Sequence, residues 1–216
     1  MNPIFIILKK QFKDTFKNKS ILIQFVMFPL LAVIMTNAIS LENMPANFFG
    51  TLFASMYVGM APLTGISAII SEEKEKHTLR VLLMAGVSPV QYLLGTGCYV
   101  FLACMPGRLI LSTGILVSIV VGATIGIQCK NQMTAASVTV PVMMVLSFLP
   151  MLSMFNDTIA KIACFTYTEQ IRLLIGEIQV SSGHIPDVRI LLLNIVVFGT
   201  MFSFFYRKQG KMEILC

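Results

Sequence analysis

Six stretches of the chain contain no Asp, Glu, Lys or Arg, and most ionisable residues fall between them. These stretches are residues 20–41, 43–71, 81–107, 109–129, 131–156 and 190–206. A bilayer core is about 30 Å thick, and a helix needs roughly 20 apolar residues to cross it. A surface helix of a soluble protein would carry a polar face, which these stretches lack. The pattern predicts an all-α polytopic membrane protein with six transmembrane helices in one domain, residues 1–216.

The composition also favours a membrane protein. Hydrophobic residues make up 56% of the 216 residues and charged residues only 12%, which is too little charge for the surface of a soluble domain of this size. The net charge of +6 is typical of nucleic-acid binders too, but no soluble segment combines basic residues with interleaved aromatics. We therefore expect a lipid bilayer and no nucleic acid among the partners. The five cysteines lack the paired spacing of zinc ligands, so no metal site is predicted.

The basic residues predict an orientation. With both termini in the cytoplasm, twelve Lys and Arg residues lie on the inner side and four on the outer side, namely Arg108, Lys161, Arg172 and Arg189. The positive-inside rule places the loops with more Lys and Arg in the cytoplasm, so it favours this orientation over the opposite one. We expect a multi-pass protein of the cell membrane, in a bacterial plasma membrane, with cytoplasmic N- and C-termini.

Two segments outside the six stretches are amphipathic. In residues 1–19, Ile4, Ile7 and Phe12 share one half of a helical wheel and four lysines fill the other. This predicts an interfacial helix on the cytoplasmic side; the alternative is a basic segment that only sets topology. In the expected external segment, residues 155–189, apolar residues follow 3–4 spacing over 158–178. This predicts an external or re-entrant amphipathic helix before the last span, acting either as a gate or as an inert helix packed on the bundle.

Small residues recur at every fourth position of the fourth stretch. Gly114, Ser118, Gly122 and Gly126 would let two helices approach closely in lipid. They are the predicted helix-packing residues, and the neighbouring helix belongs either to this chain or to a second copy. Prolines inside several stretches predict kinks: Pro29, Pro62, Pro141 and Pro150.

The third stretch is short once the preceding loop is subtracted. Residues 92–107 would form a helix of about 24 Å, less than the thickness of the bilayer core. Met105-Pro106-Gly107-Arg108 then predicts a turn. The third and fourth stretches therefore form either two full spans or a short hairpin.

Two chemical features are missing from the sequence. No Asp or Glu falls within the six stretches, although ion-coupled carriers usually need an intramembrane carboxylate. The chain also has no Gly-x-x-x-x-Gly-Lys-Ser/Thr loop, the common phosphate-binding motif of ATPases. We therefore expect no enzyme activity in this chain, and uphill transport would take its energy from another subunit.

The most specific segment is the expected cytoplasmic loop, residues 71–90. Ser71 is placed to cap a helix whose first turn contains Glu72 and Glu73, as the helix dipole favours. Glu72 and Lys76 are four residues apart and can form an ion pair. Together they predict a capped, charged helix at the membrane surface.

The rest of this loop completes a predicted helix–turn–helix elbow. Leu79 begins an apolar edge, Gly86 ends the helix, and Ser88-Pro89 begins another with a cap and a proline at its first position. The elbow is charged on one side and apolar on the other. It is either a docking site for a partner or a well-capped connector.

One run of residues carries a family resemblance: Glu72-Glu73-Lys74-Glu75-Lys76-His77-Thr78-Leu79, then Leu82-Leu83, Val87-Ser88-Pro89 and Leu94-Gly95. It resembles the signature of ABC-2-type transporter permeases, approximately Glu-Glu-Lys-Glu-x-Gly-Thr-Leu, then Ser-Pro-Val and Leu-Leu-Gly-Lys. The interfacial helix, the six spans and Lys130-Asn131-Gln132 after the fourth span are similar too. The chain departs from the motif at His77, where glycine is usual, and at Thr96, where lysine is common. The distance from Gly95 to Lys130 is also shorter than usual.

The resemblance implies the permease domain of an ATP-binding-cassette exporter. Such a chain works with a second permease subunit, identical or related, and with two separate ABC ATPase subunits that bind the ATP and Mg. The loop 71–90 would be the coupling element. The residues that would shape the ATPase contact are Glu72, Glu73, Lys76, Thr78, Leu79, Ser88 and Pro89.

The cargo class follows from the short external segments and from the 15 Met and 16 Phe residues. Methionine-rich surfaces adapt to varied apolar ligands, although most of these side chains would face lipid. We expect an amphipathic or hydrophobic substrate: a peptide such as an antimicrobial peptide, a drug or a lipid. A membrane receptor or scaffold subunit without transport activity is the alternative. An ion channel is less favoured, because no filter-like segment appears.

Overall fold

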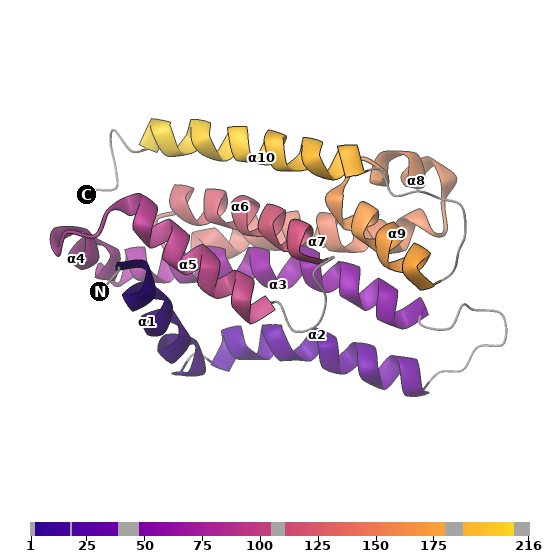
Figure 1. The fold of residues 1–216 in the computed structure, drawn as a ribbon, viewed down its shortest axis with the longest axis horizontal. Helices are drawn as coiled ribbons and strands as arrows, with labels where there is room; N and C mark the ends of the chain where they lie inside the picture. Colours follow the sequence, from indigo (N-terminus) through magenta and orange to yellow (C-terminus); the bar gives the residue numbers. More distant parts are fainter. Residues whose placement is uncertain (1–2, 18, 39–47, 105–110, 180–187, 210–216) are drawn as a thin grey trace.

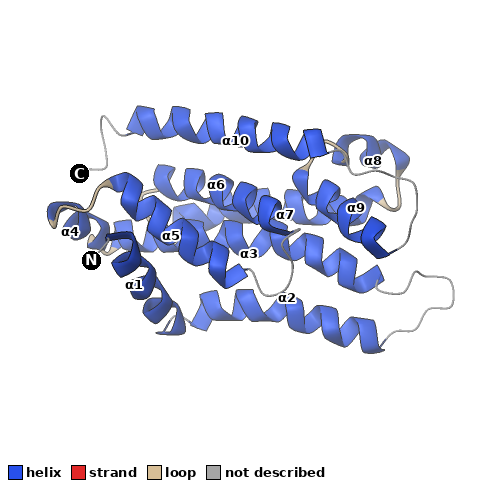
Figure 2. Cartoon of the chain, in the orientation of Figure 1, coloured by secondary structure: helices blue, strands red, loops and turns tan. Residues whose placement is uncertain are grey.

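The computed structural model describes residues 3–17, 19–38, 48–104, 111–179 and 188–209. Within these ranges the chain forms ten helices and no strand (Figure 2), so the predicted all-α class is confirmed. The helices are α1 (Pro3–Lys17), α2 (Lys19–Ala38), α3 (Phe48–Glu75), α4 (Thr78–Met84), α5 (Pro89–Cys104), α6 (Ser112–Gln128), α7 (Gln132–Ser153), α8 (Asp157–Ala163), α9 (Tyr167–Gln179) and α10 (Val188–Gln209).

Each uncharged stretch corresponds to one of the six longer apolar helices, α2, α3, α5, α6, α7 and α10. Figure 1 shows these helices lying side by side along the long axis of the molecule, with α1, α4 and the last turn of α10 at one end. The helices α8 and α9 lie at the other end, and successive long helices run in opposite directions.

The centre of the bundle is formed by α3 and α6, which pack against each other. Residues on all sides of these two helices are buried, including Val58, Leu63 and Ile66 of α3 and Ile115 and Val117 of α6. The other long helices surround this pair: α2 and α7 pack on α3, and α10 packs on α6.

The surrounding helices expose apolar side chains. Val33 of α2, Val145 of α7 and Val196 of α10 are each 60% or more exposed. Water disfavours contiguous apolar surface of this kind, whereas hydrocarbon accepts it. Three helices in the described ranges, α3, α7 and α10, are long and apolar enough to cross a membrane. The described apolar parts of α2, α5 and α6 are shorter.

The four small residues of the fourth stretch pack inside this chain. A methyl group on Gly122 would lie 2.3 Å from the carbonyl oxygen of Leu63, and one on Gly126 would lie 3.0 Å from Ile70 Cβ, both on α3. Ser118 Oγ donates a hydrogen bond to the carbonyl of Val58 (2.5 Å), also on α3. The neighbour that packs against these small residues is therefore α3 of the same chain. Gly114 faces Val58 and Ile171 of α9.

The first boundary predicted for the loop is wrong. The helix α3 continues without a break to Glu75, so Ser71 does not cap a new helix, and Glu72 and Glu73 lie in a last turn instead of a first. Ser71 Oγ donates to the carbonyl of Ser67, one turn earlier (2.8 Å). A serine hydroxyl bonds such a carbonyl as readily as it caps a helix, which made the signal ambiguous.

The single amphipathic helix predicted over residues 158–178 is in fact two helices, α8 and α9, separated at Cys164–Thr166. Asn156 caps α8 by accepting hydrogen bonds from the backbone amides of Thr158 and Ile159. The polar residues of α9 do not form an exposed face either, since Glu169 and Gln170 are buried. The periodicity marked the apolar side correctly, because Ile171 and Ile175 pack in the core.

Candidate functional site

The elbow forms between the end of α3 and the start of α5, at the same end of the bundle as α1 (Figure 1). His77 separates α3 from α4 and has φ 56°, in the left-handed region. Gly86, with φ 88°, ends the short helix α4. Ser88 and Gln91 then cap α5 reciprocally, each side-chain oxygen accepting from the other residue's backbone amide. The predicted start of a helix at Ser88-Pro89 is confirmed.

Glu73 fastens α1 to the bundle. Its side chain is 10% exposed and accepts hydrogen bonds from Gln11 Nε2 (2.8 Å) and from the Lys10 ammonium. On the same face of α1, Ile7 is buried over Gly95 of α5, where a methyl group would meet Ile7 Cγ2 at 2.9 Å. The Glu73 side chain is too enclosed to contact a partner directly, so it can affect the surface only by positioning α1.

Lys74 and Glu75 bind the ends of two other helices. Lys74 Nζ donates to the carbonyls of Ile127 (2.6 Å) and Cys129 (2.8 Å), at the C-terminus of α6. Glu75 Oε2 accepts from the backbone amide of Gln132 (2.9 Å), at the N-terminus of α7. Each charge has the sign that complements the dipole of the helix it binds, a contribution of about 0.3–1 kcal/mol apiece. Burial raises the pKa of the Cys129 thiol, an effect that Lys74 opposes.

Glu72 and Lys76 form the predicted ion pair, with 2.5 Å between Lys76 Nζ and Glu72 Oε1. The hydrogen bond to Glu72 raises the pKa of Lys76, so this ammonium stays charged at physiological pH. The Lys76 side chain is 65% exposed. Glu72 and Lys76 therefore face outward. The three residues between them bind α1, α6 and α7.

The remaining predicted residues lie on α4 and α5. Thr78 is the first residue of α4 and Pro89 the first of α5, with Ser88 exposed just before it. Leu79 is half-buried and packs against the core. The outer side of α4 exposes the apolar side chains of Val81 and Met84. Arg80 is exposed as well, and it lines the cavity behind the elbow.

A cavity of about 430 Å³ lies behind the elbow. It is lined by α4, by the end of α3, by the start of α5, by the α6–α7 connection and by Tyr206 of α10. Its charged and polar lining residues are Lys74, Glu75, His77, Arg80, Lys130, Asn131, Tyr92 and Tyr206, and its apolar ones are Ile70, Leu79, Pro89, Leu93 and Ile127.

Sequence reasoning missed two groups of polar residues. The first comprises Lys74 and Glu75, whose partners lie 53 and 57 positions along the chain. Lys130-Asn131-Gln132, between two apolar stretches, was the available signal for those partners, because it marks where one helix ends and another begins. The second group lies at the opposite end of the bundle. There buried Glu169 binds Arg172 through both carboxylate oxygens (2.5 and 3.0 Å) and accepts from Ser153 Oγ (3.1 Å).

No family model, no curated protein and no solved structure matches this chain.

Proposed function

We propose that this chain is the membrane-spanning subunit of an ATP-binding-cassette exporter of the ABC-2 type. Separate ATPase subunits would hydrolyse ATP, and a second permease subunit, identical or related, would complete the pathway. In this proposal all six long helices cross the membrane, and the elbow faces the cytoplasm. The elbow would be the surface that receives the ATPase.

The observation that carries the proposal is the backbone at His77. Its φ of 56° belongs to the left-handed region, which costs an ordinary residue roughly 1–2 kcal/mol and costs glycine little. The ABC-2 motif has glycine at this position. The fold therefore requires a left-handed backbone at position 77, which glycine, the residue of the motif, adopts most easily. This agreement supports the resemblance independently of the side chains of the motif.

The contacts of residues 73–75 support a coupling role. A partner that pushes on α4 displaces the end of α3, which is bonded to α1, α6 and α7 through Glu73, Lys74 and Glu75. Because α3 and α6 form the centre of the bundle, a movement at the elbow reaches the helices that pack around them. A connector without mechanical function would not need three charged side chains fastened to three different helices.

The apolar cargo class rests on the exposed methionines. The exposed surface of α7 includes Met133, Met144 and Met151, and such side chains adapt to varied apolar ligands as well as to lipid. We propose a membrane-active peptide, a hydrophobic drug or a lipid. Deleting the transporter should then raise sensitivity to at least one such compound, whereas a cargo confined to sugar polymers or simple ions would refute this class.

The central experiment is purification of the chain with its partners from native membranes. An ATPase subunit should accompany it, and vesicles containing the complex should accumulate substrate only with hydrolysable ATP. Because Glu73 is buried, the surface is better tested with Val81→Glu combined with Met84→Glu on the outer side of α4, since both side chains are exposed and neither lines the cavity. This variant should insert normally and lose at least about tenfold in substrate-stimulated ATPase activity, the effect of losing a contact worth about 1.4 kcal/mol.

The matched control is Phe155→Glu combined with Ile162→Glu, which replaces two exposed apolar side chains at the opposite end of the bundle. It should keep its ATPase coupling. Full activity in the Val81/Met84 variant would show that the elbow is only a connector. A stable chain that never recruits an ATPase would favour the receptor or scaffold alternative.

A further inference from the structure

The cavity behind the elbow is basic. Among the described residues that line it, Lys74, Arg80 and Lys130 are basic and Glu75 is acidic. Lys74 Nζ donates to two carbonyl oxygens at the end of α6. A concave site with excess charge of one sign concentrates counter-ions of the other. The ligand that fits this lining is an anion.

We propose that this cavity binds the phosphate headgroup of an anionic phospholipid from the leaflet that surrounds this end of the bundle. Basic pockets between transmembrane helices at the membrane surface are suited to such headgroups. Arg80 can hold two phosphate oxygens at once, whereas Lys130 acts as a point charge. The Tyr206 hydroxyl can add a neutral donor. The volume of about 430 Å³ is within the range of roughly 300–1,000 Å³ that ligand pockets occupy.

The position of the cavity points to a lipid rather than to a soluble anion. Its walls include Leu93 of α5, Ile127 of α6 and Tyr206 of α10, so apolar side chains line it on the side of the bundle. Both α5 and α10 pack on α6 (Figure 1). Beside the lining residues, Leu94 of α5 and Phe204 of α10 are exposed apolar side chains along which acyl chains can lie. The cavity is thus lined by charged and apolar side chains together.

Thermal unfolding of the purified chain in neutral detergent tests this proposal. Saturating phosphatidylglycerol should raise Tm by about 5 °C more than phosphatidylcholine does, the scale expected for a ligand well above its Kd. In the variant Arg80→Gln/Lys130→Gln most of this excess should disappear. Native mass spectrometry should show the same loss in the number of retained anionic lipids. Glu75→Gln, which removes the negative charge and keeps an acceptor oxygen, should retain them more strongly than the wild type.

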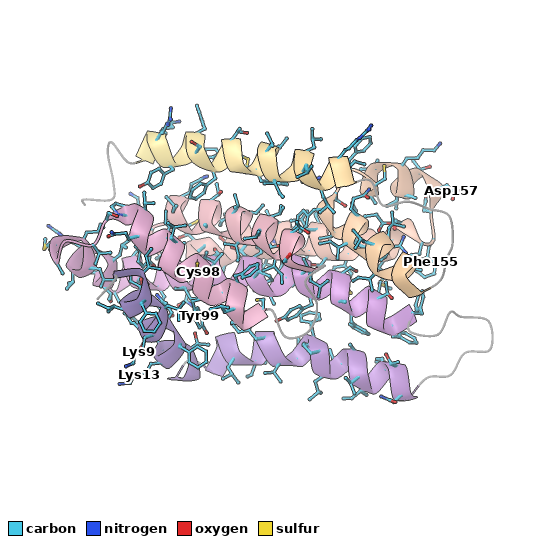
Figure 3. The ribbon with its side chains drawn as sticks, viewed as in Figure 1. Lys9, Lys13, Cys98, Tyr99, Phe155 and Asp157 are labelled. Atoms are coloured by element: carbon cyan, nitrogen blue, oxygen red, sulfur yellow. The ribbon has the colours of Figure 1, made fainter. Side chains whose placement is uncertain are left out.

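The control variant is Lys9→Gln/Lys13→Gln, which removes the same charge from the same end of the bundle. Figure 3 shows these two lysines on α1, and neither lines the cavity. This variant should keep the whole excess in Tm. Equal loss in both variants would mean only a general attraction of anionic lipid, and an undiminished excess in the cavity variant would likewise overturn the proposal. If the double variant does not fold, Arg80→Gln alone, at an exposed residue, is read in the same way.

A soluble phosphate ester offers the same chemistry as the headgroup. Glycerol 3-phosphate at the same phosphate concentration separates the two sources. If it stabilises the wild type as much as phosphatidylglycerol does, and the cavity variant abolishes the effect, the phosphate site stands and the lipid source is rejected. The inference rests on the cavity and its place in a membrane protein, so it survives if no ATPase partner is found.

Discussion

At the scale of single residues, α3 and α6 can approach closely because α6 has glycines and a serine where they meet. Gly122 has no room for even a methyl group, because its neighbour is a backbone carbonyl that cannot move aside. Gly114 meets the flexible end of Ile171 as well as Val58. Ser118 uses its small size differently: its hydroxyl bonds the Val58 carbonyl and lies 2.7 Å from the Tyr167 hydroxyl.

The first prediction concerns Gly122→Ala. The added methyl group would lie 2.3 Å from the Leu63 carbonyl oxygen, so α3 and α6 must separate. The expected cost is about 1–3 kcal/mol, as for other overpacked cores, and it is measured as a lower Tm in detergent. Gly199→Ala on α10 is the control, since nothing lies within 4 Å of its added methyl group, and it should leave Tm unchanged or raise it. Equal effects of the two variants would show that the close contact of α3 and α6 is not required.

At the scale of elements, the end of α3 is a junction. Helix ends leave unpaired amides and carbonyls, and α6 and α7 satisfy some of theirs with Lys74 and Glu75. The third connection, from Glu73 to α1, joins a helix that otherwise rests on α5 through Ile7 and Gly95. One end of one helix therefore positions three others around the elbow.

The second prediction concerns Glu73→Ala. Gln11 would lose its acceptor and Lys10 would lose one of its two carboxylate partners, in a contact where Glu73 and Gln11 are buried, at a cost of about 1.5–3 kcal/mol. Hydrogen exchange over residues 3–15 should accelerate by roughly ten- to a hundredfold, because α1 then opens locally without the rest of the bundle. Glu72→Ala is the control. It removes an exposed pair, worth little, and α1 should keep its protection. Unchanged exchange in Glu73→Ala would mean that the contact with α5 alone holds α1.

The helices themselves followed from the sequence, because hydrophobic runs, caps and prolines act locally. Each uncharged stretch contains one long helix, and Gly86, Ser88 and Pro89 ended and began helices where predicted. The failures concern polar side chains whose hydrogen-bond partners the pattern does not identify. Ser71 satisfied itself inside α3. Glu169 looked like a surface residue, yet Arg172 and Ser153 supply the hydrogen bonds that let it be buried.

At the scale of the whole molecule, the described part of the chain shows a graded exposure that suits a membrane. The central helices α3 and α6 are enclosed by protein, and the helices around them turn apolar side chains outward. Basic side chains gather at the elbow end, from α1, the end of α3, α4, Lys130 and the last turn of α10. Three described helices, α3, α7 and α10, are long and apolar enough to cross a membrane. The number of crossings therefore depends on whether the shorter apolar helices α2, α5 and α6 cross as well.

The last prediction distinguishes six crossings from three by labelling single cysteines in sealed vesicles. Lys9→Cys on α1, Met84→Cys on α4 and Phe155→Cys before α8 are placed in a chain whose native cysteines are serine. All three positions are exposed, and Figure 3 shows Lys9 and Phe155 at opposite ends of the bundle. If α2 crosses, Lys9 and Met84 react with a membrane-impermeant reagent from the same side and Phe155 from the other.

If only α3, α7 and α10 cross, α1 lies on the other side from α4, and Lys9 reacts together with Phe155. Permeabilised vesicles are the control, because every position must then react fully. The described α2 runs antiparallel to α3 and packs along it (Figure 1), and its outer face is apolar. An α2 left outside the bilayer would expose that face to water, so we expect labelling of Lys9 and Met84 from one side. Labelling of Lys9 and Met84 from opposite sides would refute the six-helix topology and the orientation derived from it.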